Sequence, residues 1–183
     1  MRLRDNESRE RDVMTARTTA AAVANAFLDL QERDSGNFPR IDQMKIQKLV
    51  FYAHAWHLAL RDTPLFDDDI EAWPWGPVAR DVYLAFKDNG RKPIAGQRAT
   101  TLTSTGSGFR IAEPPPPTQE EMKVIRAVWE SHKPLTGVQL SNATHADGEP
   151  WSIVSQGFGG NLSAKPRIPN DLIADVFKAK AKR

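Results

Sequence analysis

The segment from Trp73 to Val78 constrains the fold of this chain more than any other six residues. It contains two tryptophans, two prolines and one glycine. Each proline fixes its backbone φ angle and lacks an N–H donor, while the glycine admits the positive φ angles that other residues avoid. This composition predicts a stiff turn. Because rigid aromatic surface is typical both of cores and of protein-binding sites, Trp73 and Trp75 are candidates for either role.

The rest of the chain is helical in its pattern of apolar residues. The stripe that follows Asp42 covers more than half the circumference of a helix, so we expect this helix to be central. Each predicted helix or helical turn begins at a residue typical of helix N-termini. These start residues are Thr18 or Thr19, Asp42, Pro77, Thr118, Thr136, Pro150 and Asn170.

Two stretches have the character of strands. Residues 100–103 and 109–111 flank a turn sequence and predict a modest hairpin, and residues 65–73 have room for a short strand. We therefore predict a mainly α fold, a compact bundle of about five to seven helices with one or two short β-hairpins. Its organisation is a disordered N-terminal extension (1–17), a single helical domain (18–178) with a loop or hairpin insertion (91–117), and a basic tail (179–183).

Composition excludes several classes of protein. The 183 residues include no cysteine, so disulfides, thiolate metal sites and cysteine nucleophiles are ruled out. No apolar run approaches the roughly 20 residues that a membrane helix needs, and the N-terminus lacks the apolar core of a signal peptide. We expect a cytoplasmic protein that makes no contact with membranes.

The net charge of +2 does not indicate a nucleic-acid-binding body. Residues 161–183 contribute +4 and residues 1–17 contribute +1, which leaves the region between them at −3. Because a body of that sign repels phosphates, nucleic acid is an unlikely partner.

No catalytic or metal-binding motif is evident. His54 and His57 are three residues apart, but no third ligand stands at a familiar spacing. His145 and Asp147 resemble two members of a catalytic triad, without the sequence that presents a nucleophilic serine. Glycine-rich phosphate loops are also missing. We predict no enzyme activity, no catalytic residues, no cofactor and no bound metal.

Some residues outside the tryptophan turn are also candidates for contact with a partner. Trp151 lies beside Pro150 in a connection, where an indole is either buried with a partner for its N–H or exposed for binding. Lys45 and Lys48 are placed by the helical pattern on the polar side of the helix after Asp42. They are expected to be solvated, or to contact acidic groups on a partner.

Three motifs together resemble the Panacea domain, a family of small antitoxins that includes the SocA type. The first is Lys45-Ile-Gln-Lys-Leu-Val-Phe-Tyr-Ala53 followed by Trp56-His-Leu58. The second is Glu71-Ala-Trp73 and Trp75-Gly-Pro-Val78 with Asp81-Val-Tyr83 after it. The third is Leu140-Ser141, Thr144-His145 and Glu149-Pro-Trp151. Their order and spacing agree over roughly residues 20–178.

The resemblance implies a protein that is encoded beside a toxin and neutralises it by direct contact. In the SocA type it further implies a proteolytic adaptor that delivers the toxin to the ClpXP protease, an AAA+ protease. The expected partner-binding residues lie in or near the three motifs. They are Lys45, Lys48, Trp73, Trp75, Tyr83, His145 and Trp151.

Two other functions compete with the antitoxin hypothesis. One is a DNA-binding regulator that uses the predicted hairpin and an adjacent helix as a winged helix, with the basic tail on phosphates. The other is a hydrolase that depends on His145 and Asp147.

Overall fold

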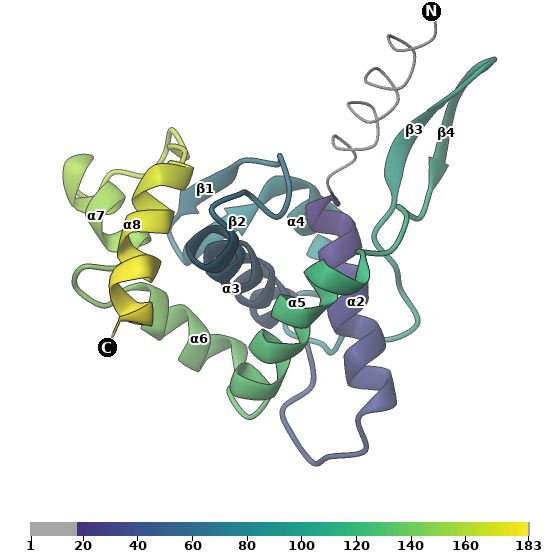
Figure 1. The fold of residues 1–183 in the computed structure, drawn as a ribbon, viewed down its shortest axis with the longest axis horizontal. Helices are drawn as coiled ribbons and strands as arrows, with labels where there is room; N and C mark the ends of the chain where they lie inside the picture. Colours follow the sequence, from purple (N-terminus) through teal and green to yellow (C-terminus); the bar gives the residue numbers. More distant parts are fainter. Residues whose placement is uncertain (1–17, 183) are drawn as a thin grey trace, which may run out of the picture.

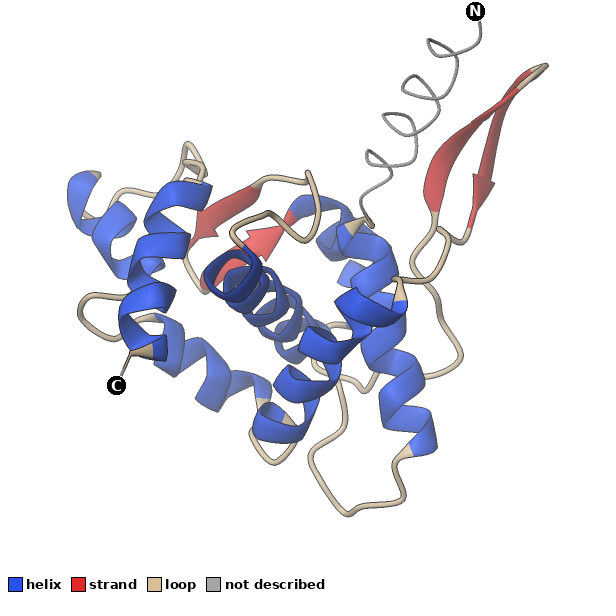
Figure 2. Ribbon diagram, in the orientation of Figure 1, coloured by secondary structure: helices blue, strands red, loops and turns tan. Residues whose placement is uncertain are grey.

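The computed structural model describes residues 18–182, so the predicted disorder of residues 1–17 lies outside the described part of the chain. Within that part the fold is mainly α with two short antiparallel hairpins, which confirms the prediction (Figures 1 and 2). The α-helices are α2 (Ala20–Arg33), α3 (Gln43–Arg61), α4 (Arg80–Phe86), α5 (Gln119–His132), α6 (Gly137–Thr144), α7 (Pro150–Gly157) and α8 (Asn170–Ala181), with a 3-10 turn, η1 (Lys87–Asn89). The strands are β1 (Ile70–Trp73), β2 (Gly76–Ala79), β3 (Thr101–Thr105) and β4 (Gly108–Ala112).

Helix α3 is the centre of the molecule, as its apolar pattern predicted. It contacts α2, α5, α6, α8 and the β1–β2 hairpin, which surround it in Figure 1. Twelve of its nineteen residues are buried. Four of the twelve carry polar or charged side chains, namely Lys45, Gln47, Lys48 and His54, and these hold neighbouring segments through hydrogen bonds.

Local capping explains where four of the helices begin. The side chains of Thr19, Asp42, Thr118 and Thr136 each accept a hydrogen bond from a backbone N–H of the first turn. Such a bond satisfies one of the donors that a helix N-terminus leaves unpaired. Thr118 and Thr136 also form full capping boxes with the third helical residue. Asp42 and Thr118 were predicted as caps, Thr19 as one of two alternatives with Thr18, and Thr136 as the start of its helix.

The prediction that a helix starts at Pro77 is wrong. Pro77 lies in β2, paired with Ala72 of β1, and helix α4 begins three residues later at Arg80. The N–H of Ala72 donates to the carbonyl oxygen of Pro166, on the side away from β2. Ala72 and Pro77 therefore face each other without exchanging ladder hydrogen bonds, and the missing N–H of proline costs the hairpin nothing.

Residues 166–168 complete this small sheet from the far end of the chain. Besides the Ala72 bond, Ile168 donates its N–H to the carbonyl oxygen of Ile70. An isolated antiparallel bridge joins Glu71 and Arg167. Strand β1 is therefore held on both edges, which makes the tryptophan turn a supported part of the body rather than a free loop.

The β3–β4 hairpin confirms the hairpin predicted from residues 100–103 and 109–111, and it extends away from the helical body (Figure 1). Leu102 is directly opposite Ile111, and Phe109 lies two residues from Ile111 on the same face. All three side chains are exposed.

The C-terminal end is more ordered than predicted. Helix α8 continues to Ala181, so residues 179–181 extend it rather than beginning a separate tail. Lys180 forms an ion pair with Glu149, which joins α8 to the N-cap of α7. None of the helices in residues 18–182 has both the length and the apolar content needed to cross a bilayer.

Candidate functional site

The β1–β2 turn presents Trp75 on a fixed backbone. Trp73 pairs with Gly76 at the end of the hairpin, and Gly76 has a φ angle of +107°. The carbonyl oxygen of Trp75 accepts a hydrogen bond of 2.9 Å from the hydroxyl of Ser141 in α6. The side chain of Trp75 is nevertheless 72% exposed. An exposed indole on an anchored backbone is typical of a protein-binding site.

Trp73 and Tyr83 form the side of the turn nearer to α4. Their ring centroids are 4.7 Å apart. The Trp73 indole donates to a carboxylate oxygen of Glu71 at 2.6 Å, and the ammonium of Lys165 lies 3.9 Å from its ring centroid. Trp73 is half-buried, because Tyr83 and Lys165 contact its ring and Glu71 binds its N–H.

Trp151 and His145 support the other side of the turn. The Trp151 indole donates to the carbonyl oxygen of Trp73 at 2.8 Å, and its ring centroid lies 3.8 Å from that of His145. The Nε2 atom of His145 is 3.4 Å from the carbonyl oxygen of Pro74. The second and third sequence motifs therefore meet at one place in the structure.

Lys48 is buried, so the expectation that it lies on a solvated polar face is wrong. It is 1% exposed, and its ammonium donates to the carbonyl oxygen of Pro77 at 3.2 Å. Burial lowers the pKa of Lys48 to about 7 because the charged form loses its hydration. The cause of its burial is tertiary: the β1–β2 turn and α6 cover this side of α3.

Lys45 is also buried, which corrects the same expectation, and it lies apart from the turn. It is fully buried and donates to the carbonyl oxygens of Pro39 and Lys133 at 2.6 and 2.8 Å. Burial lowers the pKa of Lys45 to about 8, although the nearby carboxylate of Asp42 opposes this shift. Lys45 therefore anchors two loops at its own end of α3 and is not part of the surface around Trp75.

A groove opens between the first turns of α3, the tryptophan turn and α6. We call it the tryptophan groove. One cavity of this groove has a volume of about 330 Å³ and apolar walls. It is lined by Asp42, Gln43, Met44, Gln47, Lys48, Trp73, Trp75, Val78, Tyr83, Gly90, Arg91 and Val138. A second hollow of about 440 Å³ continues from it over α6, sharing Met44, Trp75, Arg91 and Val138 and adding Ser141 and Asn142.

Four of the expected partner-binding residues line this groove: Lys48, Trp73, Trp75 and Tyr83. His145 and Trp151 support the turn from behind, and Lys45 is outside it. Sequence reasoning missed Met44, Arg91 and Val138, which lie on three different elements or loops. Val138 is 60% exposed although it belongs to an apolar helical stripe. This exposed apolar residue on α6 was the one feature of the sequence that could have indicated a binding surface there.

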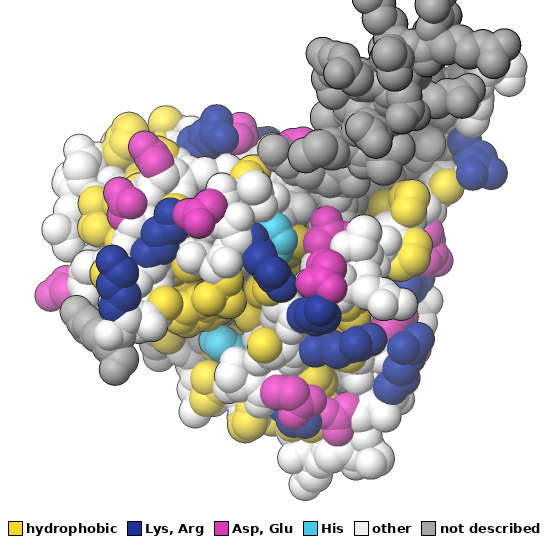
Figure 3. Space-filling view, in the orientation of Figure 1, with side chains coloured by type: hydrophobic (Ala, Val, Ile, Leu, Met, Phe, Trp, Pro, Cys, Tyr) yellow, Lys and Arg dark blue, Asp and Glu magenta, His cyan; other side chains and the backbone are white. Residues whose placement is uncertain are grey.

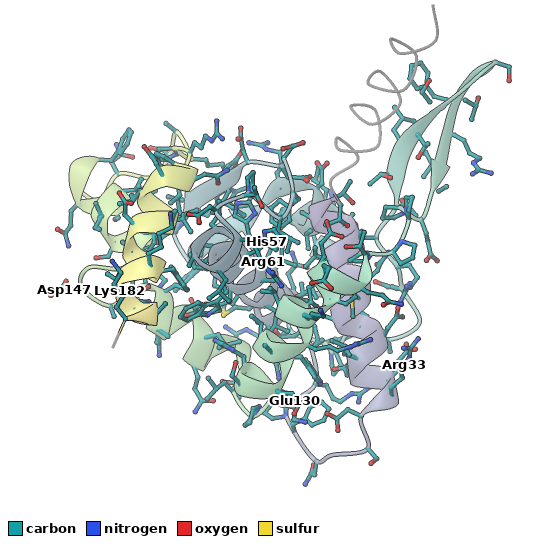
Figure 4. All side chains as sticks on the ribbon, viewed as in Figure 1. Arg33, His57, Arg61, Glu130, Asp147 and Lys182 are labelled. Carbon is teal, nitrogen blue, oxygen red and sulfur yellow. The ribbon has the colours of Figure 1, made fainter. Side chains whose placement is uncertain are left out.

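The opposite end of α3 has a different surface. His57 and Arg61, in the last turns of α3, are labelled near the centre of Figure 4. The same view in space-filling form shows lysine, arginine and acidic side chains over α5 and α8, with apolar side chains in the hollow between them (Figure 3). A nineteen-residue helix is roughly 28 Å long, so this face and the tryptophan groove are well separated.

The arrangement does not assemble the proposed His–Asp pair. The ring nitrogens of His145 face the carbonyl oxygens of Ser141 and Pro74 rather than Asp147. Asp147 is exposed and lies at the outer edge of the molecule in Figure 4. Among residues 18–182, no three histidine, aspartate or glutamate side chains are grouped so that they could hold a metal ion.

Comparison with known proteins identifies the family. The model of the family "Antitoxin SocA-like, Panacea domain" matches residues 46–152, from the second turn of α3 into α7. The chain belongs to this family. It is also 34% identical over 159 residues to "Antitoxin SocA" of Caulobacter vibrioides (strain NA1000 / CB15N), an alignment that covers 87% of this chain and 82% of that protein. No solved structure matches the chain.

The matched region contains most of the lining of the tryptophan groove. Within residues 46–152 lie Lys48, Trp75, Arg91 and Val138, together with the Ser141 hydroxyl that anchors the turn. Asp42, Gln43 and Met44 precede it, at the start of α3. The groove therefore lies mostly within the part of this chain that matches the family model, and a few residues before that part complete it.

Proposed function

We propose that this Panacea-domain antitoxin neutralises a protein toxin encoded beside it by direct contact through the tryptophan groove. Family membership supports the antitoxin role. The observation that carries the placement is Trp75, a large aromatic side chain that is 72% exposed on an anchored turn beside an apolar groove. The protein itself converts no substrate and works in the cytoplasm by occupying its partner.

Anchoring of the turn makes Trp75 an efficient contact. Its backbone is held by Ser141, by the paired strands and by the Trp151 indole beneath Trp73. Little conformational entropy is then lost when a partner covers the indole. The apolar walls beside it supply further area to bury.

Trp75→Ala should weaken binding of the toxin while leaving the fold intact. Because the indole is mostly exposed, its removal should change the free energy of unfolding by less than about 0.5 kcal/mol. Loss of a central aromatic anchor should cost about 2 kcal/mol of binding energy, or roughly 30-fold in Kd. The measurement is calorimetric titration with the purified product of the adjacent reading frame.

Phe158→Ala is a matched control for Trp75→Ala. Phe158 is the C-cap of α7 and is 51% exposed, but it does not line the groove. We expect its Kd to equal that of the wild type. Equal losses in both variants would mean that the groove is not the binding face, and no binding by the wild type would contradict direct neutralisation.

We further propose that the antitoxin acts as a proteolytic adaptor, presenting the bound toxin to a ClpXP-type AAA+ protease. Tethering raises the effective concentration of a substrate at the protease without a catalytic residue in the tether. In a purified system, the half-life of the toxin should fall at least fivefold when antitoxin and protease are both present. Trp75→Ala antitoxin should remove this effect, because it no longer holds the substrate. If the toxin stays intact in the wild-type complex in the presence of the protease, the antitoxin neutralises it by covering its surface and not by delivering it for degradation.

A further inference from the structure

Lys48 is a buried amine in the lining of the tryptophan groove and has no acidic partner there. An ammonium group has three N–H donors, and the structure gives it one acceptor, the carbonyl oxygen of Pro77. No carboxylate in residues 18–182 forms an ion pair with it. The nearest acidic group on its own helix end, Asp42, accepts instead from the backbone N–H of Lys45, which caps the helix.

The groove also contains a polar atom with no hydrogen-bond partner. The Oε1 atom of Gln43 is buried and has no hydrogen-bond partner, while its Nε2 atom donates to the carbonyl oxygen of Tyr83. Gln43 and Lys48 both line the same cavity. An acceptor without a partner and an amine that uses one of its donors, both in the lining of one apolar cavity, indicate a ligand that brings a donor and an acceptor of its own.

The charges around the cavity indicate which kind of hydrogen-bond acceptor the ligand carries. Arg91 stands at the shared boundary of the two hollows, and Lys48 lies in the inner one. The only carboxylate of the lining, Asp42, is already used as a helix cap. Two cations and apolar walls are complementary to a carboxylate carried beside an apolar side chain.

We propose that the tryptophan groove binds a segment of the toxin in which an apolar side chain stands beside an aspartate or glutamate, whose carboxylate pairs with Lys48. The apolar side chain lies between Trp75, Met44 and Val138, and a backbone N–H of the same segment donates to Gln43. This rests on the proposed function, and it adds the chemistry of the partner's segment.

The pH dependence of binding tests the ion pair. Lys48 has a pKa of about 7 when the groove is empty, and a bound carboxylate raises it. Above pH 7 each binding event must then take up a proton, so the Kd of the wild type for the product of the adjacent reading frame should rise up to tenfold per pH unit between 7 and 9. Other titratable groups near Lys48 are Asp42, Tyr83 and Arg91 in the groove and His145 at the end of α6.

The Lys48→Met variant distinguishes the contribution of Lys48 to the pH dependence of binding from the contributions of those groups and of titratable groups on the toxin. Its Kd at pH 7 should be at least tenfold weaker than that of the wild type, and its pH profile between 7 and 9 should be flat relative to the wild type. Lys123→Met, at an exposed position on α5, should retain the wild-type profile. Far-UV circular dichroism and thermal melting confirm that both variants are folded.

The outcomes are distinguishable. Parallel pH profiles and equal affinities for wild type and Lys48→Met would overturn the ion pair while leaving direct toxin binding in place. Absence of binding by the wild type at every pH would overturn the proposed function as well. If the substitution instead changes self-association in sedimentation experiments and leaves toxin binding unaltered, the groove holds a second copy of this chain and the inference is wrong.

Discussion

The free energy of unfolding of this protein should rise as the pH increases from 7 to 9.5, and Lys48→Met should remove most of that rise. Lys48 has a pKa of about 7 in the folded state and about 10.5 in the unfolded chain. Between these values the unfolded state binds more protons, so raising the pH favours the folded state. At about 1.4 kcal/mol per unit, Lys48 alone contributes about 3 kcal/mol over this interval. Lys45, whose pKa is also lowered, adds to the rise above pH 8.

The variant should also be more stable than the wild type at pH 7. Methionine has nearly the volume of lysine, needs no hydration and suits the apolar surroundings of α3. The methionine leaves the carbonyl oxygen of Pro77 without a hydrogen-bond donor, and this loss cancels part of the increase in stability. We expect a net increase of about 2 kcal/mol at pH 7 that disappears as the pH rises, so that the wild type is the more stable protein by about 1 kcal/mol at pH 9.5.

Urea unfolding at several pH values provides the measurement. Lys123→Met is the matched control because its side chain is exposed, and its stability should follow the wild type at every pH. The series stops at pH 9.5 because burial raises the pKa of Tyr52, so ionisation of tyrosine in the unfolded state opposes the effect at higher pH. A Lys48→Met protein that is less stable than wild type at pH 7, with the same pH dependence, would show that the amine is hydrated.

A buried lysine that lowers stability fits a binding role better than a structural one. Proteins keep destabilising groups where function needs them, and a partner's carboxylate would recover the interaction that the folded antitoxin lacks. This connects the stability prediction to the proposed ion pair. The two measurements are independent, because one uses the antitoxin alone and the other uses the complex.

Local signals account for what could be predicted from the sequence. Helix starts at or next to Thr19, Asp42, Thr118 and Thr136 could be predicted, because a capping side chain and its N–H partner lie within three residues of each other. The central position of α3 followed from its broad apolar surface.

Non-local packing accounts for what could not be predicted. Pro77 resembles a helix start, but pairing with Ala72, and of β1 with residues 166–168, makes it part of a strand. Lys48 follows a polar helical pattern, but the tryptophan turn and α6 cover it. Both errors depend on contacts with another element. Lys48 is covered by the turn that contains Pro77, 29 residues along the chain, and Pro77 pairs with β1, whose other edge is held by residues 166–168. Val138 and Arg91 join the groove for the same reason.

Gly76→Ala should lower the free energy of unfolding by about 3 kcal/mol. This is the largest effect that we expect from an alanine substitution in the tryptophan turn. Two causes combine. Gly76 has a φ angle of +107°, which an L-residue adopts only with strain. A Cβ atom there would also lie 2.6 Å from the ammonium of Lys48 and 2.9 Å from the hydroxyl of Thr144, so the lysine, α6 or the turn must move.

Two other glycines separate these causes. Gly148 has a φ angle of +80° and open space around its Cβ position, so Gly148→Ala should cost about 1 kcal/mol from backbone strain alone. Gly106, in the β3–β4 turn, has open space and no such φ angle, so Gly106→Ala should be nearly neutral. Urea unfolding at pH 7 gives all three values. If Gly76→Ala costs no more than Gly148→Ala, the Lys48 amine does not lie beneath the tryptophan turn, and the groove lacks the cation on which the proposed ion pair depends.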